Sequence, residues 1–270
     1  MLHDQRRDIG FAIDQIRTHH RDRMFAMNQR IRLENALSAF IRTQLGWQQA
    51  LPEPERKKIE KAAKQLIKDG GGDFAEIVAA SKAAAKPFVK IENMHVREME
   101  KLAESLPVWD AFGAGIWCFG PASLATILGI AGDLSNYPTH SHLWKRCGLA
   151  VIDERRQGNP GPHASAEEWI RHGYSPRRRS LIYVIGAALV KRNGERDGRY
   201  RAVYDRRKAY ELERGMPKGH AHNRAQRYME KKLLRNLWNA WRVLHSANEL
   251  GVGGHGRLAD LGHSKSAPDA

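Results

Sequence analysis

Arginine and lysine are the residues whose types and spacing point most directly to chemistry in this sequence. From Arg171 to Arg242 the chain has 20 Lys and Arg against 6 Asp and Glu, so this quarter of the chain carries nearly all of the formal net charge of +15. A local field of this size attracts a polyanion, and nucleic acid is the commonest one. The alternative is a solvated helix surface with a solubility role. The cations that we expect to contact phosphate are Lys145, Arg146, Arg155, Arg156, Arg177, Arg178, Arg179, Arg206, Arg207, Lys231 and Lys232.

Three consecutive arginines, Arg177 to Arg179, follow a strong helix start at Ser175 and Pro176. Cations at a helix N-terminus oppose the helix dipole, which favours a functional reason for them. Tyrosines lie among the later cations at positions 200, 204 and 210. They could stack on bases or pack in a core, and the sequence leaves both open.

An uncharged stretch, "WCFGPASLATIL" at 117–128, lies at the centre of this basic chain. The Gly120–Pro121 pair resembles the turn of a helix–hairpin–helix element, in which a phosphate reaches backbone N–H groups at the start of a helix. We therefore expect Gly120 and Pro121 to contact a phosphate strand without reading its base sequence. An ordinary corner between two helices in a hydrophobic core is the alternative.

Metal and cofactor sites are not expected from the sequence. His140 and His142, like His220 and His222, have a spacing that two zinc ligands can use, but no Cys or carboxylate accompanies either pair. We expect them to be helix-end residues. Paired carboxylates at 153–154 and 167–168 are more typical of surface or capping positions than of a Mg²⁺ site.

Apolar residues recur at helical spacing through most of the chain, which predicts an all-α fold. We expect a helical or coiled-coil arm over 1–107 with a joint at Gly70–Gly72, and with one helix ending near Lys86 where Pro87 begins the next. A helical domain is expected over 108–248 and a disordered tail over 249–270. The stretch 150–163 is the one place where a hairpin is expected, with "GNPG" as its turn.

Three segments together resemble the C-terminal domain of transposases of the IS110/IS116/IS902 family. They are "CFGPASLATILGIAGDLSNYPTHSHLWKRCGLA", "GYSPRRRSLIYVIGAAL" and the last pair of helices, from "YRAVYDRRKAYELERG" to "KGHAHNRAQRYMEKKLLRNLWNAWR". The resemblance covers about 106–242, roughly half of the chain. It implies a DNA-binding protein of DNA transposition or recombination, in a family where some members use a structured guide RNA. It also implies that residues 8–105 form a helical arm that aids homo-oligomerisation.

Two features of that family have no counterpart in the sequence. The family's RuvC-like domain carries acidic metal ligands on strands, and we expect it to be absent from the first 105 residues; Mg²⁺ is expected only if a partner domain supplies the site. The family's nucleophilic serine follows the Gly-Leu pair, but Gly148 and Leu149 are followed by "AVIDERRQG". Catalytic residues therefore stay unassigned, and the enzyme class stays open. The alternative function is a non-catalytic binder of structured RNA or DNA from a phage or mobile element.

Compartment and membrane association can also be predicted from composition. No apolar run approaches the ~18–20 residues that a membrane-spanning helix needs. The N-terminus "MLHDQRRDIG" lacks the apolar region of a secretory signal. Two cysteines, Cys118 and Cys147, are too few for a disulfide framework. We expect a cytoplasmic protein with no membrane partner.

Overall fold

The structure, a computed structural model, describes residues 2–191 and 198–249, and it confirms the all-α class. Two strands of two residues each are the only extended elements in the described residues. The described helices are α1 (Leu2–Gln44), α2 (Glu53–Lys68), α3 (Ala75–Glu104), α4 (Pro121–Ala131), α5 (His140–Arg146), α6 (Ala166–His172), α7 (Pro176–Lys191), α8 (Arg199–Glu213) and α9 (Lys218–Glu249). Short 3-10 or π turns are η1 (Gly72–Phe74), η2 (Trp109–Gly113) and η3 (Leu134–Asn136). Apart from Glu249, the tail expected to be disordered lies outside the described residues.

The chain divides into two compact units, and the divisions fall at Thr18 and Arg97 rather than near residue 107. His19–Arg97 forms one unit, and the beginning of α1 joins the chain from Glu98 onward in the other. The physical reason is burial: Ile13 and Ile16 of α1 and Met99 of α3 belong to the same apolar cluster as α4 and α9.

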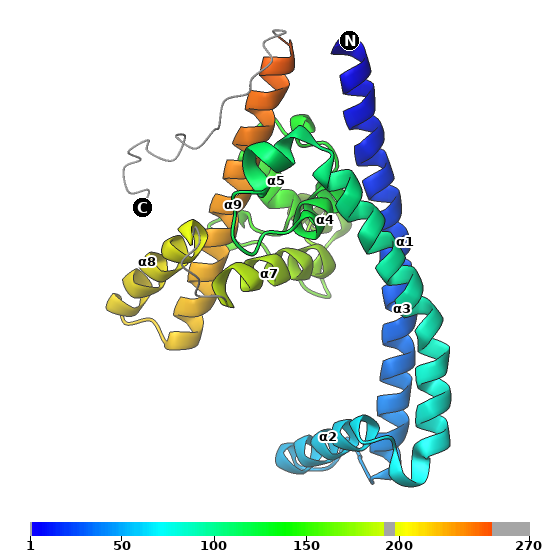
Figure 1. Cartoon of the computed structure of the whole chain (residues 1–270). Coiled ribbons are helices and arrows are strands. Elements are labelled where there is room, and N and C mark those ends of the chain that lie inside the picture. Colours follow the sequence, from blue (N-terminus) through cyan, green and yellow to red (C-terminus); the bar gives the residue numbers. More distant parts are fainter. Residues whose placement is uncertain (1, 192–197, 250–270) are drawn as a thin grey trace. The chain divides into compact units, whose positions relative to one another are not determined.

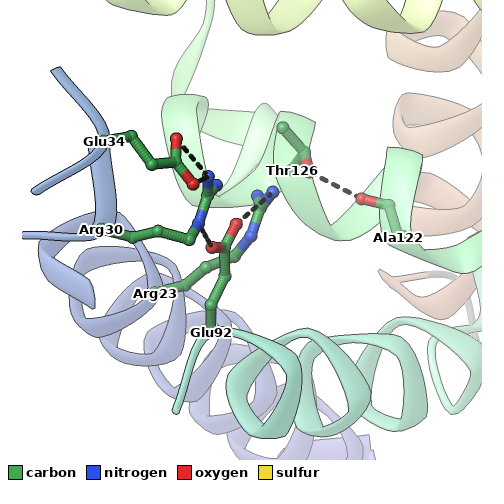
Figure 2. A network of polar contacts seen from close by, with 6 residues as sticks. All are labelled: Arg23, Arg30, Glu34, Glu92, Ala122 and Thr126. Atoms are coloured by element: carbon green, nitrogen blue, oxygen red, sulfur yellow. Dashed lines mark hydrogen bonds and ion pairs between the residues drawn. The ribbon is translucent and has the colours of Figure 1, made fainter. Parts of the chain in front are cut away.

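The larger unit is organised around α9, which packs against α5, α7 and α8 (Figure 1). Its buried positions recur at three- and four-residue spacing, as expected for the apolar stripe of a helix that faces a core; they are Ala221, Ala225, Met229, Leu233, Leu237 and Ala240. The second central helix is α4, which is buried over five consecutive residues, Leu124 to Leu128. Thr126 can be buried because its hydroxyl donates to the Ala122 carbonyl oxygen at 2.7 Å (Figure 2).

The smaller unit has its own apolar cluster, formed by Leu37, Ile41, Ala63 and Val78. A polar network also links α1 to α3 there (Figure 2). Arg30 Nε donates to Glu92 Oε2 at 3.1 Å and its Nη1 donates to Glu34 Oε1 at 3.0 Å. The bond to Glu34 raises the pKa of Arg30, and Glu92 adds to this against the opposing effect of burial.

Two local expectations are wrong. Pro87 lies inside α3, which runs without interruption from Ala75 to Glu104. A proline removes one helical hydrogen bond, but Pro87 is exposed, so the freed carbonyl can be hydrated. The hairpin forms at β1 (Val151–Ile152) and β2 (Arg155–Arg156), and its turn is Asp153–Glu154 rather than "GNPG". Both turn residues have positive φ, 49° and 59°, as a tight two-residue hairpin requires.

Other helix boundaries agree with the sequence. Ser165 accepts from the Glu168 N–H and the Glu168 carboxylate accepts from the Ser165 N–H, which is the predicted capping box. The helix α7 begins at Pro176, as predicted. None of the described helices is long and apolar enough to cross a membrane.

Candidate nucleic-acid interface

The Gly120–Pro121 corner begins α4, with Pro121 at its first position. Gly120 has an ordinary extended conformation (φ −82°), and the left-handed residue of the corner is Cys118 (φ 64°). The segment before the corner is the π turn η2 rather than a full α-helix. A Cβ built at Gly120 would meet no atom within 4 Å. Space is therefore open beside the first turn of α4, where a ligand or a larger side chain could lie.

Gln157 joins the segments that carry four of the predicted cations, Lys145, Arg146, Arg155 and Arg156. Its side chain is 2% exposed. Its Oε1 accepts from the Ala150 N–H at 3.0 Å, and its Nε2 donates to the carbonyl oxygens of Lys145 at 3.0 Å and His172 at 2.6 Å. One amide thus joins the end of α5, the end of α6 and the hairpin, and the sequence analysis did not identify it.

A basic cluster, which we define as Arg156, Arg179, Arg227 and Lys231, forms where the hairpin, α7 and α9 meet. Burial, together with the charges of Arg179 and Arg156, lowers the pKa of Arg227 to about 10. Burial and the charge of Arg227 likewise lower the pKa of Lys231. Burial is the larger cause of both shifts, and the neighbouring positive charges add to it, so a bound anion would stabilise the charged forms of these side chains.

One buried carboxylate, Glu230, lies within the basic cluster. Its Oε2 is 2.8 Å from Arg179 Nη2, and its Oε1 accepts from Gln226 Nε2 at 3.0 Å. Burial raises the pKa of Glu230 to about 7, although Arg179, Gln226 and Arg227 favour the charged form. A single carboxylate, itself only partly ionised near neutral pH, leaves the basic cluster with excess positive charge.

A second pair of predicted cations, Arg146 and Arg178, is held by backbone carbonyl groups. Arg146 Nε donates to the Ile130 carbonyl oxygen at 2.9 Å, and Arg178 Nη2 donates to the Gly173 carbonyl oxygen at 2.8 Å. Burial and the charge of Arg146 lower the pKa of Arg178. Both guanidinium groups therefore stabilise the local backbone and also contribute positive charge to the surface.

Lys231 has an aromatic neighbour in Trp144. Its Nζ lies 4.7 Å from the Trp144 ring centroid, and Trp144 Nε1 donates to the Lys231 carbonyl oxygen at 3.0 Å. Lys145, beside Trp144, is exposed.

The cations of α8 and of the first half of α9 lie among tyrosines. Arg207 lies over the rings of Tyr210 and Tyr228, and Lys232 lies over Tyr228. The predicted tyrosines separate by burial: Tyr200 and Tyr204 are each 3% exposed and belong to the core, whereas Tyr210 is 43% exposed.

The remaining predicted residues, Arg155, Arg177 and Arg206, are exposed. The hydrogen bonds of Arg146 and Arg178 and the ion pair of Arg179 go to residues other than Gly120 and Pro121. The structure therefore brings Arg156, Arg179 and Lys231 together and pairs Arg146 with Arg178. It leaves the corner as a separate feature.

Three residues of this region were missed from the sequence: Arg227, Gln226 and Glu230. Gln226 and Glu230 occupy positions on the apolar stripe of α9, where they interrupt Ala225, Met229 and Leu233. Polar residues at core positions are the signal that could have identified them.

Serines and histidines have local structural partners. The Ser165 hydroxyl caps α6, and the Ser175 hydroxyl accepts from the Arg178 N–H at 3.4 Å. His142 Nδ1 lies 2.9 Å from Thr139 Oγ1, and His222 Nδ1 lies 2.8 Å from Tyr204 Oη. Within residues 2–191 and 198–249, no three His, Cys, Asp or Glu side chains gather as a metal site would require.

Comparisons with protein families, with curated protein sequences and with solved structures find no match to this chain.

Proposed function

We propose that the larger unit binds the sugar–phosphate backbone of nucleic acid, with DNA as the principal partner. The basic cluster is the observation that carries this proposal. Three guanidinium groups from the hairpin, α7 and α9 influence one another there around one buried carboxylate. Phosphate groups relieve this repulsion, and guanidinium groups bind them with two parallel hydrogen bonds.

The biological setting that we propose is DNA transposition or recombination of the IS110 type. Its support is the resemblance of residues 106–242 to the C-terminal domain of that family of transposases. By the same resemblance, a structured guide RNA is a second partner, and the N-terminal helices join copies of the chain into a homo-oligomer.

A specific observation favours a second candidate, a non-catalytic binder of structured DNA or RNA from a phage or mobile element. No serine follows Leu149 at the family's position, and the nearby Ser165 and Ser175 serve as helix caps. Incubation with element-end DNA and Mg²⁺ separates the two candidates. A covalent protein–DNA adduct mapped to a serine supports the recombinase, and binding without any adduct supports the second candidate.

Salt dependence of binding tests the proposal itself. Fluorescence anisotropy with a labelled duplex is measured from 50 to 200 mM salt. The logarithm of the association constant should fall with log[salt] with a slope of about −0.9 for each phosphate contact on duplex DNA. A slope near zero, or no binding at 50 mM salt, overturns the proposal.

A matched charge-loss control makes this test specific to the larger unit. Arg156→Ala with Arg177→Ala removes two cations from it, and Arg21→Ala with Lys57→Ala removes two exposed cations from the smaller unit. The first variant should bind more weakly and with a shallower slope. Equal losses in both variants would contradict a binding surface on the larger unit.

A further inference from the structure

The helix pair α8 and α9 carries a partly exposed group of aromatic and cationic side chains that phosphate binding does not require. We name it the aromatic stack and define it as Tyr210, Arg207 and Tyr228. The ring centroids of Tyr210 and Tyr228 lie 4.9 Å and 5.0 Å from the Arg207 Cζ atom. The guanidinium group thus lies over both rings and joins Tyr228 of α9 to Tyr210 of α8.

Helical spacing places further cations beside the aromatic stack. Arg207 and Tyr210 of α8 and Arg214, the C-cap residue of that helix, are three and four residues apart. Arg224, Tyr228 and Lys232 are four residues apart on α9. Arg214 Cζ lies 5.4 Å from the Tyr210 centroid, and Lys232 Nζ lies 5.5 Å from the Tyr228 centroid.

A buried carboxylate holds the aromatic stack in place. Glu211 is 1% exposed; its Oε1 accepts from Arg207 Nε at 2.9 Å and its Oε2 accepts from Arg224 Nη1 at 3.1 Å. Burial raises the pKa of Glu211, but the hydrogen bonds from Arg207 and Arg224 outweigh it and leave the pKa lower than usual. The Arg207 guanidinium is therefore positioned before any ligand arrives.

Both tyrosines of the aromatic stack are partly exposed beside their cations. Tyr210 is 43% exposed and Tyr228 is 37% exposed, whereas Tyr204, six residues earlier on α8, is 3% exposed and hydrogen-bonded to His222. Aromatic rings are usually buried, because their burial stabilises a fold. Two partly exposed rings beside positive charges are instead typical of a surface that binds bases by stacking.

We infer that the aromatic stack binds unpaired nucleobases, so that the protein recognises single-stranded or branched nucleic acid in addition to duplex backbone. Paired bases inside a duplex present no open faces, whereas an unpaired base can stack on Tyr210 or Tyr228 while its phosphate contacts Arg214, Arg224 or Lys232. This inference rests on the proposed function, since it assigns a substrate class to the same unit.

The test compares three labelled probes of one base sequence by anisotropy: single-stranded DNA, single-stranded RNA and blunt duplex DNA. Tyr210→Ala with Tyr228→Ala should weaken binding to a single-stranded probe about 5- to 150-fold, the range for losing one stacked base, and change duplex binding less than about twofold. Weakening on the DNA arm, the RNA arm or both supports the inference and identifies the source of the unpaired bases.

Two further variants separate stacking from folding. Tyr210→Phe with Tyr228→Phe keeps both rings and should retain single-strand binding. Phe25→Ala removes an exposed aromatic ring of the smaller unit and should leave single-strand binding unchanged. Normal duplex binding with no selective loss in the alanine variant overturns this inference alone. Failure of the unaltered protein to bind any of the three probes at 50 mM salt overturns the proposed function and this inference with it.

Discussion

Glu230 on α9 and Arg179 on α7 form an ion pair across the core of the larger unit, with 2.8 Å between Oε2 and Nη2. The glutamate side chain is 0% exposed and the arginine side chain 16%. A pair this deeply buried is costly to break, because removal of one partner leaves the other charge without compensation. Glu230 therefore governs both the packing of α7 on α9 and the charge of the basic cluster.

The stability of the protein should depend on pH through Glu230. Its pKa is raised by burial to about 7 in the folded protein from an ordinary 4.5. The folded state therefore binds this proton more tightly than the unfolded state. The stabilisation is fully present below the unfolded pKa and is lost as pH rises through the folded one, by up to about 1.4 kcal/mol per pH unit. Urea unfolding of the unaltered protein and of Glu230→Gln between pH 5 and 8 measures this pH dependence. If the two proteins differ in free energy of unfolding by an amount that does not change with pH, the prediction is wrong.

Gly186 should tolerate no larger residue. A Cβ at this position of α7 would lie 2.5 Å from Glu230 Oε1 and 2.7 Å from its Cγ. We expect Gly186→Ala to lower the free energy of unfolding by about 1–3 kcal/mol, even though alanine favours helices. Gly219→Ala on α9 is the control, since no atom lies within 4 Å of its Cβ position. Chemical denaturation of both variants should show a loss only at Gly186.

Gln157 should be necessary for the stability of the hairpin region. Gln157→Ala removes three hydrogen bonds and leaves buried backbone groups without partners, so we expect a loss of about 2–4 kcal/mol. The thermal midpoint should fall accordingly. The nearby Asn159→Ala, which removes one exposed hydrogen bond to the Gly161 N–H, should have a smaller effect. Equal effects of the two substitutions would argue against a bridging role for Gln157.

Arg155 and Arg156 should matter for binding and not for stability. Both are exposed on β2, so Arg155→Ala with Arg156→Ala should leave the thermal midpoint unchanged. Nucleic-acid affinity should fall about tenfold for each cation that contacts phosphate, since a hydrogen bond to a charged group contributes about 1.5 kcal/mol or more. The loss should be equal for unrelated base sequences, which anisotropy with two different duplexes measures. A loss confined to one of the duplexes would mean that these arginines read bases.

The two cysteines should differ in reactivity. Burial raises the pKa of Cys147 to about 12, so its thiol stays protonated and unreactive at pH 8. Cys118 is partly exposed. Mass mapping after a short treatment of the folded protein with iodoacetamide should find label on Cys118 and none on Cys147. Label on Cys147 before Cys118 would contradict the burial of α5 against its neighbours.

Local features of the fold could be predicted from the sequence because they depend on residues within about four positions of one another. Ser165 and Ser175 mark helix starts, and the apolar spacing of α9 marks a core helix. The error at Pro87 has the same origin: a local preference against proline in helices was outweighed by the continuity of a long, exposed helix.

The sequence by itself determined the all-α class, most helix starts and the concentration of positive charge after Arg171. Only the tertiary structure decided how the cations differ: Arg178 and Arg227 donate to carbonyl groups, Arg179 pairs with Glu230, and Arg155 faces solvent. Charge is a property of composition and can be counted along a chain. Burial and partnership depend on packing between segments distant in sequence, so they exist only once the chain has folded.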